Sequence, residues 1–293
     1  MGTPWDRAAE RYIEEWVPRF VPYHLDLVRE LAIASGQRVL VACAGPGAEV
    51  LAVARAVGDS GHVRALDPSD DMVAICDAQV KKAGFAQVSC ERGGAGDIGD
   101  GNWHAIVCAF GLHALSDRKG ALERWSNALA PNGKVGVLTF GPPEDSDPFE
   151  MLSQALVDLE PDFSARPPRV GADRESMLRM FEEAGLSLVR HTILRHTVSF
   201  PSAEAFTQAI REGRTWRRVW DELGPERIGR VTARFFDRVG GPTVPLVFEP
   251  GVTLAIAAIP GAEVELADRP RSIRVPALST VPSAPPLPPE PDK

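Results

Sequence analysis

The sequence predicts an α/β fold in which helices cover both faces of one doubly wound sheet. From residue 38 to residue 140, short apolar runs alternate with segments of helical period. A glycine turn, Gly45-Pro46-Gly47, directly follows the first apolar run. Strands that alternate with helices in this way form right-handed βαβ crossovers and therefore a parallel sheet. We expect a Rossmann-like sheet of seven strands, mostly parallel with an antiparallel edge strand, and an inserted helical cap.

Helices are predicted to open the chain, over residues 1–36. The apolar residues that recur at helical spacing begin with Tyr12, Ile13, Trp16, Val17 and Phe20. Gly36 is expected to end this stretch, because glycine takes the left-handed cap conformation without a Cβ clash.

Five strands and three helices are expected to alternate after this stretch. The strands are predicted at 38–43, 62–66, 87–91, 103–110 and 134–140, and the helices at 48–57, 70–83 and 118–129. The first strand, RVLVAC, is almost wholly apolar, as is typical of a strand buried on both faces.

The pattern changes after Gly141. The acidic, proline-interrupted segment 145–168 is interpreted as a loop or lid, with an amphipathic helix around Met151 to Leu159 that covers the substrate or is an ordinary surface helix. A helix at 173–184 precedes a strand at 188–200, and a last strand lies at 246–259. Helices at 203–223 and 225–239 form the cap insert, about 201–241. We read residues 1–260 as one domain closed by an antiparallel edge pair, and the proline-rich residues 261–293 as a disordered tail.

Composition excludes several classes of function. A formal net charge of −8 argues against a chain-wide nucleic-acid or acidic-membrane surface. No apolar run approaches the ~20 residues that span a bilayer. The four cysteines lack C-x-x-C spacing and a histidine at ligand spacing, which favours a reducing cytosol over a zinc or disulfide scaffold. We expect a cytoplasmic protein with a small-molecule substrate and no nucleic-acid, membrane or metal partner; its oligomeric state is not predicted.

The glycine turn and one aspartate predict a nucleoside site. Gly45 and Gly47 remove side chains that would keep a ligand from the backbone at a helix N-terminus. Asp67 ends the second predicted strand, where an acidic residue can accept both hydroxyls of a ribose. A dinucleotide fits poorly, because Val50 stands where the dinucleotide fingerprint needs a third small residue.

These motifs resemble the class I S-adenosylmethionine-dependent methyltransferases, in the small-molecule branch that includes quinone-type C-methyltransferases. The family segment V-L-D-x-G-C-G-x-G is matched by residues 39–47, D-x-S-x-x-M by residues 67–72, and L-x-P-G-G by residues 129–133. The segment 107–117 also resembles the family's fourth strand and its exit. The resemblance covers about residues 5–140 and extends more weakly to 260.

The resemblance implies S-adenosylmethionine as the cofactor, with a tyrosine closing over it and a methionine against its adenine. The implied cofactor-binding residues are Tyr12, Cys43, Ala44, Gly45, Gly47, Asp67, Pro68, Met72, Gly94, Ala95 and Phe110.

Four positions depart from the family pattern. Val41 replaces an aspartate whose loss removes an anchor for the methionine ammonium or for the loop that holds it, and Cys43 replaces a glycine. Gly94 replaces the acid expected near the adenine, for which Asp97 can substitute, and His104 stands where an acid heads the fourth strand. These departures leave an alternative open: a non-methylating relative that uses the cleft for ligand binding or protein contact.

The catalytic and substrate residues are less well defined by the sequence. His113, just past the fourth strand, is the candidate base, and a helix-capping role is about equally favoured. His24 is expected to be structural or exposed. Phe206, Trp216 and Trp220 are expected to wall an apolar acceptor pocket for O- or C-methylation. The arginines of 211–238 favour a solvated face, because acids are interleaved with them; the third hypothesis, an RNA methyltransferase, would use them to contact phosphates.

Overall fold

The computed structural model describes residues 13–161, 169–212 and 214–267, and its centre is a seven-stranded sheet. The strand order is β3-β2-β1-β4-β5-β9-β6, and β1 to β5 pair in parallel. This confirms the predicted doubly wound, mostly parallel sheet. The strands are β1 (Arg38–Ala42), β2 (His62–Asp67), β3 (Val88–Arg92), β4 (Trp103–Ala109), β5 (Leu129–Phe140), β6 (Ser187–Arg195) and β9 (Gly251–Ala258).

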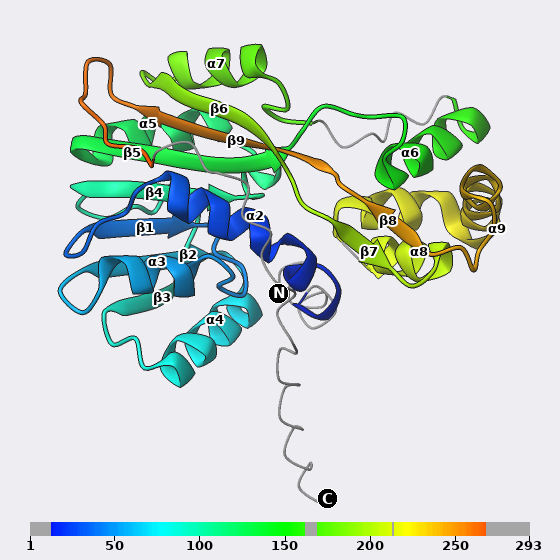
Figure 1. Cartoon of the computed structure of the whole chain (residues 1–293), viewed down its shortest axis with the longest axis horizontal. Helices are drawn as coiled ribbons and strands as arrows, with labels where there is room; N and C mark the ends of the chain where they lie inside the picture. The colour runs from blue at the N-terminus through cyan, green and yellow to red at the C-terminus, as the bar shows by residue number, and fades with distance from the viewer. Residues whose placement is uncertain (1–12, 162–168, 213, 268–293) are drawn as a thin grey trace, which may run out of the picture.

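Helices cover both faces of the sheet (Figure 1). The alternation in β1 shows why: Val39 and Val41 belong to one buried core, and Leu40 and Ala42 to the other. The first core includes residues of α2 (Val17–Glu30), α3 (Val50–Val57) and α4 (Asp70–Ala83). The second includes residues of α5 (Arg118–Ala128) and α7 (Arg174–Glu182). A strand that is apolar on every residue therefore marks a sheet buried on both sides.

The antiparallel strand is β9, and it lies one position in from the edge. It pairs antiparallel with β5 on one side and β6 on the other, so the edge strand β6 runs in the same direction as β5. The predicted antiparallel edge pair is thus confirmed in β6 and β9, but the strand that runs opposite to the others is β9 and not the edge strand. All eight residues of β9 are buried, whereas β6 carries polar, partly exposed residues such as Arg190 and His191. The more apolar strand therefore takes the interior position.

The two late strands are each broken, which the sequence analysis did not predict. The chain leaves β6 at Arg195 and forms β7 (Val198–Phe200), which pairs with β8 (Leu246–Phe248) in a separate two-stranded sheet. The Tyr23 hydroxyl binds the chain at both interruptions, between β6 and β7 and between β8 and β9. It donates to the Pro250 carbonyl at 2.8 Å and accepts the His196 N–H at 2.9 Å. Proline at 250 has no N–H for a ladder, so the interruption falls there.

The small sheet belongs to a cap that lies beside the main sheet (Figure 1). Its helices are α6 (Pro148–Leu159), α8 (Ala203–Glu212) and α9 (Arg214–Val239). α9 is kinked at Gly224, which has a φ of 75° and is followed by Pro225. The sequence predicts a boundary between two helices at this point. The expected insert, 201–241, thus contains α8 and α9, but α6 from the predicted lid also packs into the cap's own apolar core. The assignment of residues 1–260 to a single domain stays a prediction.

Candidate cofactor site

The glycine turn after β1 takes the conformation that its glycines permit. Gly45 and Gly47 have φ values of 52° and 92°, in the left-handed region. The Ala44 N–H donates to the Leu66 carbonyl at 2.9 Å, and the Gly47 N–H to the Ala44 carbonyl at 3.0 Å. A Cβ on Gly45 would meet no atom within 4 Å, so open space lies beside its backbone.

Asp67 closes the other side of this turn. It is the last residue of β2, and its Oδ2 accepts the Gly45 N–H at 2.9 Å while its Oδ1 accepts the Ser69 N–H at 3.0 Å. A carboxylate has about four acceptor sites, so one group can hold the turn and take ligand hydroxyls as well. The structure therefore brings Gly45 and Asp67 together, as their spacing in the sequence predicted.

Residues on both sides of Asp67 complete this edge of the sheet. Pro68 is exposed, and Met72 is buried in the first turn of α4, where its N–H donates to the N-cap Ser69. The Gly93 N–H donates to the Asp67 carbonyl at 3.0 Å, which brings the loop after β3 to the end of β2.

In that loop Asp97 takes a backbone role. Its Oδ2 accepts the Gly94 N–H at 2.6 Å. The carbonyl oxygen of the buried Ala95 accepts the Trp125 Nε1–H, also at 2.6 Å. Contact of this loop and of Met72 with an adenine stays a prediction. Tyr12, the predicted cofactor-closing tyrosine, lies outside the described residues.

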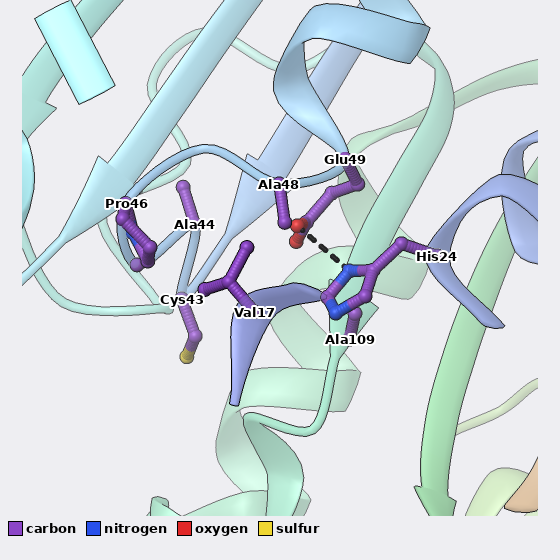
Figure 2. Close-up of a pocket in the computed structure, with 9 residues that line it drawn as sticks. Val17, His24, Cys43, Ala44, Pro46, Ala48, Glu49 and Ala109 are labelled. Atoms are coloured by element: carbon purple, nitrogen blue, oxygen red, sulfur yellow. Dashed lines mark ion pairs between the residues drawn. The ribbon is translucent and has the colours of Figure 1, made fainter. Parts of the chain in front are cut away.

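A small pocket opens next to the glycine turn, and it contains two ionisable side chains that the sequence analysis did not place there. Its lining includes Gly45, Cys43 and Ala109 from the sheet edge and His24 from α2. Glu49, immediately before α3, faces His24 across it, with His24 Nδ1 3.0 Å from Glu49 Oε2 (Figure 2). His24 and Glu49 are 5% and 1% exposed, so this is a buried pair.

Both residues carried signals in the sequence. His24 lies on the apolar stripe of α2 with Phe20 and Leu27, which indicates burial. Glu49 directly precedes a helix that is apolar except for Arg55. Their pairing is not visible in the sequence, because it depends on how α2 crosses α3.

Aromatic rings gather beside this pocket. Phe110, with a φ of 54°, follows β4, and its ring centroid lies 5.1 Å from that of Phe20, 5.3 Å from Phe140 and 5.5 Å from His24. His113, in the 3-10 turn Leu112–Ala114, is partly buried, and its ring lies 5.9 Å from Phe140. The candidate base thus lies on an apolar, aromatic side of the site.

The cysteines at the strand ends are buried or partly buried thiols. Hydrogen bonding with Cys43 and burial raise the pKa of the Cys108 thiol. The same pair lies close to Gly111, where a Cβ would meet Cys43 Cβ at 2.6 Å. A buried thiol held protonated behaves as a small apolar group, so packing accounts for Cys108, whereas Cys43 also lines the pocket.

The three residues predicted to wall the acceptor pocket lie in the core of the cap. Phe206 is fully buried against Phe149, Phe200 and Phe235. Trp216 and Trp220 stack with ring centroids 5.2 Å apart and are 6% and 5% exposed. None of the three lines the pocket beside Gly45. Direct contact with an acceptor stays a prediction; their packing is explained by the cap core.

The arginines of the cap form ion pairs with acidic residues. Arg227 and Arg230 pair with Glu160, and Arg234 and Arg238 pair with Asp158 of α6. These pairs tie α9 to α6, as an interleaved, solvated face would. The side chains of Arg217 and Arg218 lie outside the described part.

The described residues offer neither a membrane-spanning helix nor a metal-binding group of side chains. No helix among them is long and apolar enough to cross a membrane. In that same part of the chain, no three His, Cys, Asp or Glu side chains are grouped so as to hold a metal ion.

Comparison with known proteins shows what this site is similar to. The methyltransferase domain family matches residues 39–133, which hold the glycine turn, Asp67 and the end of β4. A demethylmenaquinone methyltransferase of Bacillus velezensis is 26% identical over 174 residues, 54% of this chain and 75% of that enzyme. The ubiquinone/menaquinone biosynthesis C-methyltransferase UbiE of Shewanella halifaxensis is 27% identical over 176 residues, 54% of this chain and 69% of that enzyme.

Other relatives are matched over a shorter part of their length. The chain spans 51% and 54% of the demethylmenaquinone methyltransferases of Bacillus subtilis and Anoxybacillus flavithermus. Among solved structures, the YcgJ protein of Bacillus subtilis superposes with a TM-score of 0.56 at 17% identity, over 82% of this chain and 100% of that one. The chain therefore matches the methyltransferase domain family over residues 39–133 and is similar to quinone-type C-methyltransferases, in agreement with the family and the cofactor that the sequence predicted; the strand order confirms the predicted fold class.

Proposed function

We propose that this protein transfers a methyl group from S-adenosylmethionine to an oxygen or carbon atom of a small, largely apolar acceptor, in the cytosol. The observation that carries the proposal is the Asp67 carboxylate bound to the backbone of the glycine turn, at 2.9 Å from the Gly45 nitrogen. That arrangement offers an anionic acceptor and a bare backbone at the same edge of the sheet, as a nucleoside requires.

The residues at this edge fit the cofactor. Asp67 would accept the ribose hydroxyls, the open space at Gly45 would admit the chain that continues from the ribose, and the loop of Gly94 and Ala95 would flank the base. When bound, S-adenosylmethionine supplies a methyl group on a positively charged sulfur. The remaining work of the protein is to hold the acceptor in line, exclude water and remove a proton where one is released.

The aromatic side of the site supports an apolar acceptor. Phe110, Phe140 and Phe149 are partly buried and pack against the first core, and Phe149 also packs against the cap core. Phe206, Trp216 and Trp220 fill the core of the cap. Relatives named for menaquinone and ubiquinone biosynthesis favour a quinone-like acceptor and carbon as the methylated atom.

In this proposal His113 is the general base. Its imidazole lies beside Phe140, and histidine titrates near neutrality. A carbon or hydroxyl acceptor on that aromatic surface would release its proton toward this ring.

Isothermal titration of the full chain with S-adenosylmethionine tests the proposal. We expect micromolar binding, and a loss of about 100-fold or more in Asp67→Ala, because hydrogen bonds to a charged acceptor contribute roughly 1.5–3 kcal/mol each. The matched control is Asp71→Ala, an exposed acid in the next helix that should bind like the wild type. Absence of heat from the folded wild type at millimolar cofactor would instead favour the non-methylating alternative. Mass spectrometry of co-purifying small molecules would identify the acceptor.

A further inference from the structure

We propose that Glu49, positioned by His24, binds the α-ammonium group of the amino-acid end of S-adenosylmethionine and replaces the acid that is absent at Val41. The inference rests on the proposed function, because it assigns a subsite for the same cofactor. Glu49 would be a binding residue, and His24 a positioning residue that acts through it.

The first observation is an unsatisfied buried carboxylate. Glu49 is 1% exposed, and its Oε1 has no hydrogen-bond partner among the described residues. Leaving a charged oxygen buried without a partner is costly, so such groups are normally hydrogen-bonded. A ligand that donates a hydrogen bond to Oε1 would remove this cost.

The second observation is the position of that oxygen. Glu49 and His24 face each other in this pocket (Figure 2). Gly45 lines the same pocket, on the sheet edge where Asp67 accepts the Gly45 N–H. A molecule whose ribose lies on Asp67 must pass along the open side of Gly45, and its far end then enters this pocket. In S-adenosylmethionine the far end is an amino acid, and its ammonium is the only strong donor there.

The third observation is the chemistry of the rest of the lining. Val41 is fully buried in the apolar core and offers no charge. Besides His24 and Glu49, the pocket is lined by apolar residues, glycine and the Cys43 thiol. Glu49 is therefore the acidic group in this pocket. His24 Nδ1 lies 3.0 Å from Oε2, an ion-pair distance without hydrogen-bond geometry, and this pairing leaves Oε1 for the ligand.

A purely structural role would also explain a buried pair, because His24 and Glu49 join α2 to the start of α3. The two roles differ in what they predict for ligands. A binding role affects only ligands that carry the amino group, whereas a structural role affects every nucleoside ligand equally or none.

Titration with two ligands separates these roles. S-adenosylhomocysteine carries the amino-acid end, and 5′-methylthioadenosine keeps the nucleoside and thioether but lacks it. In Glu49→Gln we expect S-adenosylhomocysteine to bind about 10- to 100-fold more weakly, as for one lost charged hydrogen bond, and 5′-methylthioadenosine to bind as in the wild type. An equal change for both ligands, or no change for either, would overturn the proposal.

Two further variants keep the test interpretable. Glu30→Gln removes another buried carboxylate of α2, paired with Arg190 away from the pocket, and should leave the ratio of the two affinities unchanged. His24→Gln should lower the affinity for S-adenosylhomocysteine alone, by less than Glu49→Gln, and it replaces Glu49→Gln if that variant does not fold.

The wild type supplies the last control, without any substitution. An analogue of S-adenosylhomocysteine that lacks the amino group should bind the wild type more weakly than S-adenosylhomocysteine itself, and the two should bind Glu49→Gln equally. A wild type that binds none of these ligands would overturn the proposed function. A wild type that binds S-adenosylhomocysteine and its deaminated analogue equally would overturn this inference alone.

Discussion

The cofactor edge of the sheet and the cap are built in different ways. At the ends of β1 and β2, the site consists of backbone turns at fixed positions, with Gly45 and Gly47 at positive φ and Asp67 bonded to the chain itself. The cap is built from aromatic side chains that are far apart in the sequence, such as Phe149, Phe206 and Phe235. The first region therefore depends on conformations that few residues can adopt, and the second on filled volume.

α2 connects the two regions. Trp16, just before the helix, donates from Nε1 to the Ala209 carbonyl of α8 at 3.3 Å and packs on Phe149 and Phe200. Two turns further along, His24 faces Glu49 in the pocket. The N-terminal end of α2 thus contacts the cap, and a later turn of the same helix lines the pocket.

The largest expected effect is on the cap. Phe206→Ala should lower the free energy of unfolding by about 3–5 kcal/mol, because it leaves a cavity in the middle of the aromatic core. Urea denaturation measures this loss. The folded variant should keep its affinity for S-adenosylhomocysteine, since Phe206 does not line the pocket beside Gly45.

Val247→Ala is the control for that substitution, because Val247 is 69% exposed on the small sheet and should change stability little. A folded Phe206→Ala that loses affinity as completely as Asp67→Ala would contradict the separation of the two regions.

At the cofactor edge, the expected effect is smaller in stability but larger in binding. In Gly47→Ala the new Cβ would lie 2.7 Å from Cys76 Sγ, at a backbone φ of +92°. The variant should lose about 1–2 kcal/mol of stability from the left-handed backbone, and it should bind S-adenosylmethionine more weakly because the turn must shift. Thermal denaturation and isothermal titration measure the two effects.

Gly229→Ala is the matched control. A Cβ at this position in α9 meets nothing within 4 Å, and the residue is not at positive φ. In a helix interior the alanine should be neutral or stabilise by about 0.5–1 kcal/mol, with no effect on binding. Gly47→Ala and Gly229→Ala with equal stability and equal affinity would show that the turn tolerates a side chain.

The contrast between local turns at the cofactor edge and long-range packing in the cap explains which features the sequence could predict. β1 to β4 and the pairing of Gly45 with Asp67 follow from signals within about thirty residues of one another, namely apolar runs, glycine stops and strand-end acids. β5 begins five residues earlier than predicted, because Leu129 pairs with Trp103 before residues 130–133 loop out and Lys134 resumes the ladder opposite Ala105.

Features that depend on contacts between distant segments were not predictable. The breaks at His196 and Pro250 depend on a hydroxyl from Tyr23, more than 170 residues away in the chain. The apolar spacing of Trp216 and Trp220 indicates a buried helix face, but it does not say whether that face meets an acceptor or the cap core. Likewise, the buried charge of Glu49 is explained only once α2 lies across α3.

The smallest expected effect concerns Asp147, where α6 of the cap begins. Burial raises the pKa of Asp147 to about 6, although its carboxylate accepts the Phe149 N–H at 2.8 Å as the helix N-cap. Because this pKa lies above the ordinary value of about 4, the stability that protonation contributes is complete below pH ~4 and is lost as the pH rises through 6.

Asp147→Asn removes the buried charge and keeps a capping oxygen. We expect the variant and the wild type to unfold at the same urea concentration below pH ~4 and the variant to be more stable at pH 7, by roughly 1 kcal/mol after allowance for the high effective dielectric of real proteins. The exposed Asp145→Asn should show no such pH-dependent gap. A stability gap for Asp147→Asn that stays constant from pH 4 to pH 7 would contradict a raised pKa of Asp147 and hence the burial of this carboxyl in the cap.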